Sequence, residues 1–168
     1  MKKLLKKHSR KLGLPPGTLV HLGDTSDSPP KITVIDYDSD NFEEKQMTDI
    51  LPLADFKKKP SISWINIDGL QNIELIEQIG QIFNIHPLTL EDVLATDQRP
   101  KSEVFENYVF IVLKMLTFNN SDKTIDSEQV SLILGDNFVL SFQEKTGDVF
   151  DPIRQRIRLA KGRIRKMR

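Results

Sequence analysis

The 168-residue chain is long enough to form one domain with its own hydrophobic core. Its 24 lysines and arginines balance its 24 aspartates and glutamates, so no overall charge favours a nucleic-acid partner. The absence of cysteine excludes thiolate metal sites and thiol catalysis and is consistent with a reducing compartment.

No segment has the length and composition of a membrane-spanning helix or of a signal peptide. The longest apolar stretch, residues 108–118, is interrupted by Lys114 and is shorter than the ~20 residues that a span needs. Residues 1–12 are basic but lack an apolar core and a cleavage site. We expect them to form a solvated, flexible arm rather than a segment that binds membrane or nucleic acid. Residues 13–168 are expected to form one domain, soluble and cytoplasmic when taken by itself.

The first part of the chain alternates short apolar runs with turn-forming residues. Glycine and proline between the runs indicate loops, and β-branched residues within them favour strands. Serine and aspartate before a short polar run favour a helix N-terminus. The predicted elements are strands at 18–21, 32–35 and 62–67, and a short helix at 42–44 capped by Ser39 or Asp40.

Two helical patterns follow these strands. In residues 73–83 isoleucine and phenylalanine recur at helical spacing, which predicts an amphipathic helix with one buried face. Residues 87–94 predict a shorter helix with Pro87 at its first position, where a missing N–H costs nothing. Glu91 and Asp92 are consecutive on this helix and point about 100° apart, which suits two separate contacts.

The last third of the chain changes to a strand-like pattern. We predict an antiparallel meander of strands at 108–117, 129–134 and 138–143, with a tight hairpin at 135–137. A final helix is expected to begin at Asp151, whose side chain would cap it. The predicted fold is therefore α+β or α/β. It has a mixed parallel and antiparallel sheet sandwiched between helices, and it ends in an antiparallel meander and a C-terminal helix.

One run of aspartates has the spacing of a calcium-binding loop. Asp36, Asp38 and Asp40 match the first three ligands of an EF-hand. The pattern then fails, because Asn41 stands where the loop needs glycine and Met47 where it needs a bidentate glutamate. We therefore interpret the run as a loop that ends in a helix cap.

Other motifs give no support for catalysis or for nucleic-acid binding. His8, His21 and His86 are far apart without a zinc-ligand pattern, and His86 is expected to terminate or cap the turn before the helix at 87–94. No nucleotide-binding or hydrolase motif occurs, so we predict that the chain is not an enzyme. The arginine-rich stripe of the last helix lacks interleaved aromatic residues. We interpret it as a solvated face or as salt bridges to a missing neighbour.

Five segments in a particular order carry a resemblance to a known family. The run IHPLTLEDVL at 85–94, followed by QRPK at 98–101, resembles the cytoplasmic domain of the CorA family of magnesium and cobalt transporters. The other segments support the same match, and the resemblance covers nearly the whole chain. The five segments are GLPPGT at 13–18, IHPLTLEDVL at 85–94, QRPK at 98–101, EQVSL at 128–132 and FQEKTGDVFDP at 142–152.

The resemblance implies metal ligands. In CorA-like proteins the aspartate at the position of Asp92 helps to bind a regulatory divalent cation between neighbouring subunits. Glu91 and the backbone carbonyl of Leu14 resemble contributors to a second cation site. The implied ion is Mg²⁺, for which Co²⁺ or Ca²⁺ can substitute, and the partner ligands would come from helices that follow Arg168. Each site would then be half complete in this chain.

The resemblance also implies a function and partners. We expect the cytosolic sensing domain of a homo-oligomeric Mg²⁺/Co²⁺ channel, pentameric by family, at the cytoplasmic face of the inner membrane. The membrane spans would follow at the C-terminal end, and no nucleic acid is expected. Two alternatives stay open, namely the cytoplasmic domain of a related zinc transporter and a free-standing soluble binding module.

Overall fold

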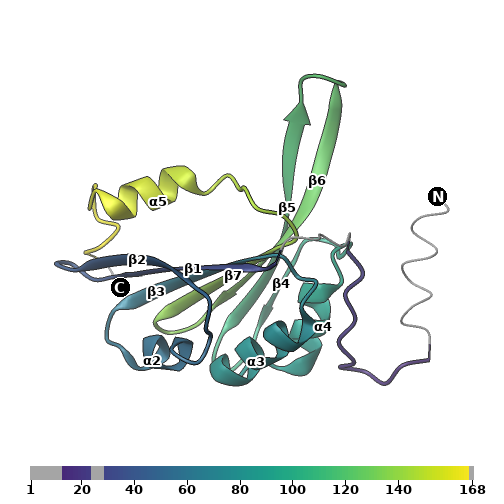
Figure 1. Ribbon diagram of the computed structural model, residues 1–168, viewed down its shortest axis with the longest axis horizontal. Helices are drawn as coiled ribbons and strands as arrows, with labels where there is room; N and C mark the ends of the chain where they lie inside the picture. Colours follow the sequence, from purple (N-terminus) through teal and green to yellow (C-terminus); the bar gives the residue numbers. More distant parts are fainter. Residues whose placement is uncertain (1–12, 24–28, 167–168) are drawn as a thin grey trace.

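The computed structural model describes residues 13–23 and 29–166, so the predicted arm at 1–12 lies outside the described residues. Within them, seven strands form one mixed sheet in the order β2-β1-β3-β7-β6-β5-β4. Helices α2, α3 and α4 cover one face, and α5 lies on the other (Figure 1). The predicted mixed sheet between helices is confirmed. The elements are β1 Lys31–Tyr37, β2 Phe42–Met47, α2 Leu53–Lys58, β3 Ile62–Asp68, α3 Ile73–Phe83, α4 Pro87–Leu94, β4 Lys101–Val104, β5 Val109–Asn119, β6 Thr124–Leu134, β7 Phe138–Gln143 and α5 Asp151–Arg158.

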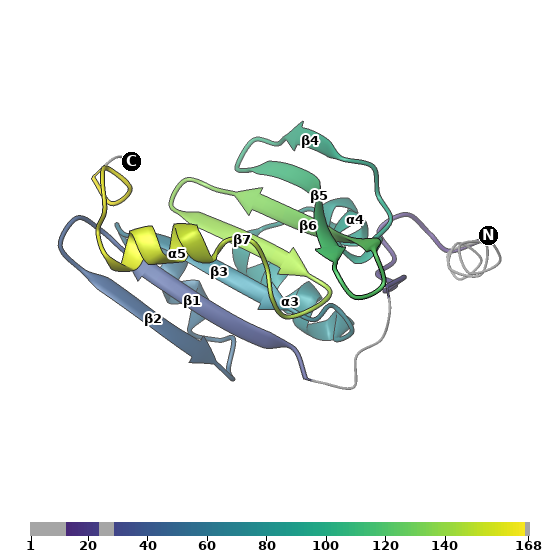
Figure 2. The same cartoon turned by 90° about the horizontal axis from the view of Figure 1, so that it is seen from above.

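The two central strands are the parallel pair of this sheet. β3 and β7 run parallel with Ile65 opposite Leu140, and each of the other neighbouring pairs is antiparallel. Ile65, Ile67 and Leu140 are completely buried, as expected for parallel strands covered on both faces. Seen from above, α5 crosses the sheet over β1, β3 and β7 (Figure 2).

The main core lies between the sheet and α2, α3 and α4. Ile76 and Ile79 of α3 are completely buried, as is Val93 of α4, and each contributes roughly 1.5–3 kcal/mol of hydrophobic stabilisation. The close packing of α3 against α4 depends on Gly80, because a Cβ there would lie 2.3 Å from Leu90 Cδ1. Both helices begin and end close to the predicted residues.

Two predicted N-terminal elements are wrong. Residues 18–21 form no strand, and the next residue, Leu22, donates its backbone N–H to the carbonyl of Leu94 at the end of α4. Residues 42–44 belong to strand β2 instead of a helix. The cause is Asp38, whose Oδ1 accepts the backbone N–H groups of Asp40 and Asn41 at 2.8 and 2.6 Å and so closes a β1–β2 turn.

The C-terminal half follows the prediction more closely. The meander is β5, β6 and β7, and the ends of β5 and β6 project from the sheet on the side of α5 (Figure 1). Helix α5 begins at Asp151, but Phe150 occupies the cap position and no side chain caps it, so the predicted cap is wrong. Helix α2 and strand β4 have no counterpart in the sequence prediction, because both are too short to show a period. No helix among the described residues is long and apolar enough to cross a membrane.

Candidate functional site

Helix α4 presents the predicted acidic pair, and its N-terminus is fixed by local chemistry. His86 precedes the helix in an extended conformation, and its Nδ1 accepts the backbone N–H of Leu88 at 3.2 Å. The backbone N–H of His86 in turn donates to Tyr108 Oη at 3.1 Å. The prediction that His86 caps this turn is confirmed.

Asp92 lies near the C-terminal end of α4 with both carboxylate oxygens engaged. Oδ1 accepts the side-chain amide of Gln98 at 2.9 Å, and Oδ2 accepts the ammonium of Lys101 at 2.6 Å. The Asp92 side chain is 24% exposed, so it faces the surface while remaining in contact with protein. Burial lowers the pKa of Lys101, but the hydrogen bonds that its ammonium donates to Asp92 and Glu103 outweigh this effect and keep that pKa above the usual value.

Gln129 of β6 holds the backbone around Asp92 in place. Its Nε2 donates to the carbonyl of Asp92 at 3.1 Å, and its Oε1 accepts the backbone N–H of Gln98 at 3.0 Å. The side chain is buried, so these bonds fix both ends of the turn that follows α4. Sequence reasoning gave Gln129 no role. A role could have been predicted from the position of this glutamine at the start of an apolar strand, because a buried polar side chain there needs hydrogen-bond partners.

Glu91 makes a separate contact with the N-terminal loop. Its Oε2 accepts the backbone N–H of Gly17 at 2.7 Å. Gly17 adopts a positive φ of 82°, a backbone conformation that favours glycine. The structure therefore brings Glu91 to the loop that contains Leu14, whose side chain is exposed, and it points Asp92 elsewhere.

The donor chemistry fits a hard divalent cation, but only in part. Carboxylate and carbonyl oxygens are the ligands that Mg²⁺ and Ca²⁺ prefer. Among the described residues, no group of three or more histidine, cysteine, aspartate or glutamate side chains could hold a metal ion. Asp92 and Glu91 can each supply a carboxylate to a site whose other ligands are water or come from another chain.

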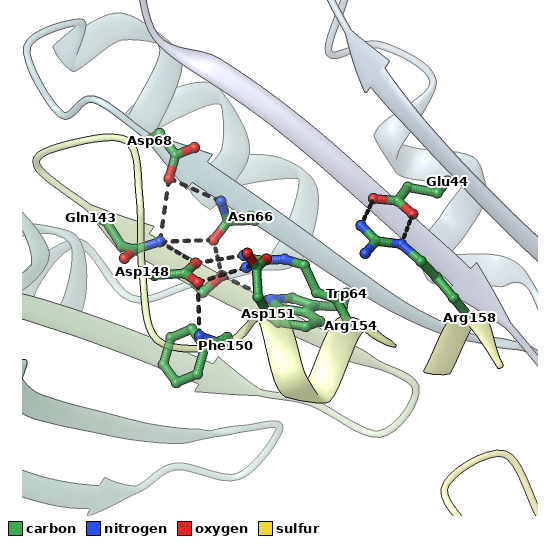
Figure 3. Close-up of polar contacts among 11 residues, drawn as sticks. Glu44, Trp64, Asn66, Asp68, Gln143, Asp148, Phe150, Asp151, Arg154 and Arg158 are labelled. Carbon is green, nitrogen blue, oxygen red and sulfur yellow. Dashed lines mark hydrogen bonds and ion pairs between the residues drawn. The ribbon is translucent and has the colours of Figure 1, made fainter. Parts of the chain in front are cut away.

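A second polar cluster lies under α5 on the opposite face of the sheet (Figure 3). Arg154 forms two hydrogen bonds to the carboxylate of Asp148, at 2.6 and 2.5 Å, and its guanidinium carbon lies 4.7 Å from the centre of the Trp64 ring. Gln143 donates to Asp68 and to Asp148 at 3.2 and 3.1 Å.

Arg154 and Asp148 of this cluster form an ion pair within the chain. Burial raises the pKa of Asp68 above its ordinary value. Burial acts in the same direction on Asp148, but hydrogen bonds from Arg154 and the backbone of Phe150 outweigh it and lower the Asp148 pKa. Arg158 likewise pairs with Glu44 at 2.6 Å. The interpretation as a solvated stripe, or as salt bridges to a missing neighbour, is therefore wrong for Arg154 and Arg158. Together with Asp148 and Glu44 they line part of a cavity of about 460 Å³.

Comparison with known proteins places the chain in a family. The model of the CorA-like Mg²⁺ transporter protein family matches residues 59–167, which include β3 to α5 and both acids of α4. The chain belongs to this CorA-like family. It is 50% identical over 163 residues to the cobalt/magnesium transport protein CorA of Thermotoga maritima. That match covers 97% of this chain and 46% of the relative, so this CorA-like chain spans about half of the relative's length.

Solved structures share the fold at low identity. The soluble domain of CorA from Methanocaldococcus jannaschii superposes with a TM-score of 0.51 and 15% identity, over 81% of this chain and 48% of that one. The full-length CmaX protein superposes with a TM-score of 0.63 and 13% identity, over 83% of this chain and 42% of that one. At such identities these similarities establish the CorA-like fold and nothing further.

Proposed function

We propose that this chain is the cytosolic sensing domain of a CorA-like Mg²⁺/Co²⁺ channel at the cytoplasmic face of the inner membrane. The similarity to the Thermotoga maritima protein over 97% of the chain supports the transporter assignment. The observation that carries the sensing role is the position of Asp92, which presents a partly exposed carboxylate on a helix end anchored by buried Gln129. A rigid, surface-facing carboxylate suits a cation site shared with another subunit.

The proposed ligand is Mg²⁺, for which Co²⁺ or Ca²⁺ can substitute. Asp92 would contribute one carboxylate, and the remaining positions would be filled by water and by a neighbouring copy in a homo-oligomer. Glu91 and the carbonyl of Leu14 would contribute to a second site, supported by the hydrogen bond that joins Glu91 to the loop of Leu14. The bound cation would supply positive charge between subunits, and Mg²⁺ retains several waters in such sites.

Carboxylate repulsion provides the coupling to the pore. Two carboxylates ~4 Å apart repel by roughly 1–4 kcal/mol at effective dielectric constants between about 80 and 20. Asp92 in one subunit and an acid of the next would push apart when no cation separates them, and the interface would loosen. A free energy of this size shifts a two-state equilibrium by about five- to several-hundredfold, so cation occupancy would select the closed state.

A transport measurement on the complete protein that contains this chain would test the proposal. The protein would be reconstituted in vesicles, and Co²⁺ influx would be measured while Mg²⁺ on the domain side is varied. Asp92→Asn keeps the shape and removes the charge, so inhibition by Mg²⁺ should weaken. Asp126→Asn, on the exposed part of β6, is the matched control and should leave inhibition unchanged.

Three results would count against the proposal. An unchanged Mg²⁺ response in Asp92→Asn would remove the sensing role. Transport of Zn²⁺ but not Mg²⁺ or Co²⁺ would favour the related zinc transporter. A complete protein without membrane spans would leave the free-standing binding module.

A further inference from the structure

The ammonium of Lys101 bridges two carboxylates. Its Nζ lies 2.6 Å from Asp92 Oδ2 and 2.9 Å from Glu103 Oε1. Both oxygens contact the same nitrogen, so the two carboxylates flank one position, and the Glu103 side chain, which is 45% exposed, has room to move toward an ion held there. The structure therefore already places a positive charge at the carboxylate that the proposed function assigns to a divalent cation.

The bridge is built into the sheet rather than formed by a loose surface side chain. Lys101 is the first residue of β4, where it pairs with Val112 of β5, and its ammonium lies 5.7 Å from the centre of the Phe110 ring. Gln98 holds the other oxygen of Asp92 at 2.9 Å, so the carboxylate has one oriented face toward Lys101. The side chains of Lys101 and Asp92 are 29% and 24% exposed, which leaves the pair open to solvent ions.

We propose that Lys101 is an intramolecular counter-ion that a divalent cation must displace from Asp92. The lysine thereby sets the cation affinity of the site, and the exchange makes Glu103 available as a second carboxylate. This inference rests on the proposed cation binding at Asp92. It adds a competitor and a second ligand that lie in the same chain.

Charge and distance both support the exchange. Asp92 and Glu103 carry two negative charges, and the single charge of Lys101 neutralises half of them. A divalent cation matches both carboxylates, and hard cations favour oxygen ligands. Oxygen–Mg²⁺ bonds measure ~2.0–2.1 Å, shorter than the present nitrogen–oxygen contacts, so the ammonium and the ion cannot share the position.

The strength of the Lys101–Asp92 ion pair predicts how much Lys101 weakens cation binding. Partly exposed ion pairs are weak, and a competitor of this strength lowers cation affinity by about 2- to 5-fold. Lys101→Met removes the charge and keeps an apolar stem of similar length against Phe110. Lys101→Arg keeps the charge and should preserve the competition. Lys58→Met, at the exposed end of α2, removes the same charge from a different part of the molecule and is the matched control.

The test titrates the 168-residue chain with Mn²⁺ and follows free Mn²⁺ by electron paramagnetic resonance. We expect Lys101→Met to tighten Mn²⁺ binding by about 2- to 5-fold, and Lys101→Arg and Lys58→Met to match the wild type. Asp92→Asn in the Lys101→Met chain should abolish the gain, and Glu103→Gln there should reduce it. Far-UV circular dichroism would verify that each variant is folded.

The possible failures are distinguishable. If Asp92→Asn weakens Mn²⁺ binding while Lys101→Met binds like Lys58→Met, the competitor role is wrong and the proposed function stands. If Lys101→Arg tightens binding as much as Lys101→Met, the effect comes from packing and the counter-ion role is wrong. If Asp92→Asn binds Mn²⁺ like the wild type in each background, the isolated chain does not bind the cation through Asp92 and the competitor role is wrong, while Mg²⁺ inhibition of the complete protein decides the proposed function separately.

Discussion

At the scale of single residues, Asp92 depends on a partner from another part of the chain. Gln129 is 37 residues from Asp92 in sequence. Its side-chain amide donates a hydrogen bond to the carbonyl of Asp92 and accepts one from the backbone N–H of Gln98, across the turn that follows α4. The net free energy of each of these hydrogen bonds is small. Removing the amide would cost more, because two buried backbone groups would lose their partner. The orientation of Asp92 is therefore a property of β6 as much as of α4.

Removing the Gln129 amide should loosen this turn. Gln129→Leu leaves the carbonyl of Asp92 and the N–H of Gln98 without their partner, so we expect a loss of about 1–3 kcal/mol in the free energy of unfolding. Urea denaturation measures the loss, and amide hydrogen exchange at residues 92–98 should accelerate. Gln78→Leu on the exposed face of α3 is the control and should stay within ~0.5 kcal/mol. An equal effect in the two variants would contradict the anchoring role.

The residue scale also shows what the sequence could predict of the site. Asp92, Glu91 and the loop of Leu14 could be predicted because they lie in short continuous segments that resemble the CorA family. Helical geometry correctly predicted that the two acids make separate contacts. Gln129, Lys101 and Glu103 were missed because their roles need strands β4 and β6 to lie beside α4, and no local pattern encodes that neighbourhood.

At the scale of elements, Arg154 is one of the residues that join α5 to the rest of the domain. Its guanidinium pairs with Asp148, whose side chain is 3% exposed, and packs over Trp64. The helix itself buries little, since among its residues Ile157 is the buried one. The arginines that suggested an outward charged stripe are thus largely part of how the helix binds its own domain.

Breaking this pair should destabilise the domain in a pH-dependent way. Arg154→Met leaves a buried carboxylate unpaired, and we expect a loss of about 3 kcal/mol near neutral pH. The pKa of Asp148 is lowered in the folded state, so its contribution is present above the unfolded value of ~3.9 and is lost as the pH falls through the folded pKa. The difference between variant and wild type should therefore narrow below about pH 4.

Urea denaturation between pH 3 and 7 measures this difference, and the exposed Arg156→Met on the same helix is the control. A constant difference across the range would show that Arg154 acts by packing on Trp64 instead.

Some helices and strands could be predicted from the sequence, and others could not. Helices α3 and α4 and the meander show clear periods, and each is confirmed. The predicted helix at 42–44 failed because turn chemistry at Asp38 outweighed a weak helical pattern. Strand 18–21 failed because an apolar, β-branched run can pack against a helix end without joining a sheet.

At the scale of the whole molecule, the two faces of the sheet should unfold together. Trp64 lies on β3 against Phe150, with ring centres 6.0 Å apart, so its fluorescence reports the α5 face, whereas far-UV circular dichroism reports every element. We expect the two thermal transitions to coincide in a single cooperative step. A fluorescence change at lower temperature would show that the α5 face melts as a separate unit.

The parallel pairing of β3 with β7 has a consequence for the growing chain. The residues of β3 from Ser63 to Asp68 each pair with a residue 75 positions later in the chain, for example Asn66 with Ser141. Ribosomes add ~5–20 residues per second, so β3 emerges roughly 4–15 s before the strand that completes its edge. During that interval an apolar strand edge with unpaired backbone groups is available to chaperones and to other nascent chains. The time until β7 is synthesised therefore sets how long the edge of β3 stays exposed to aggregation.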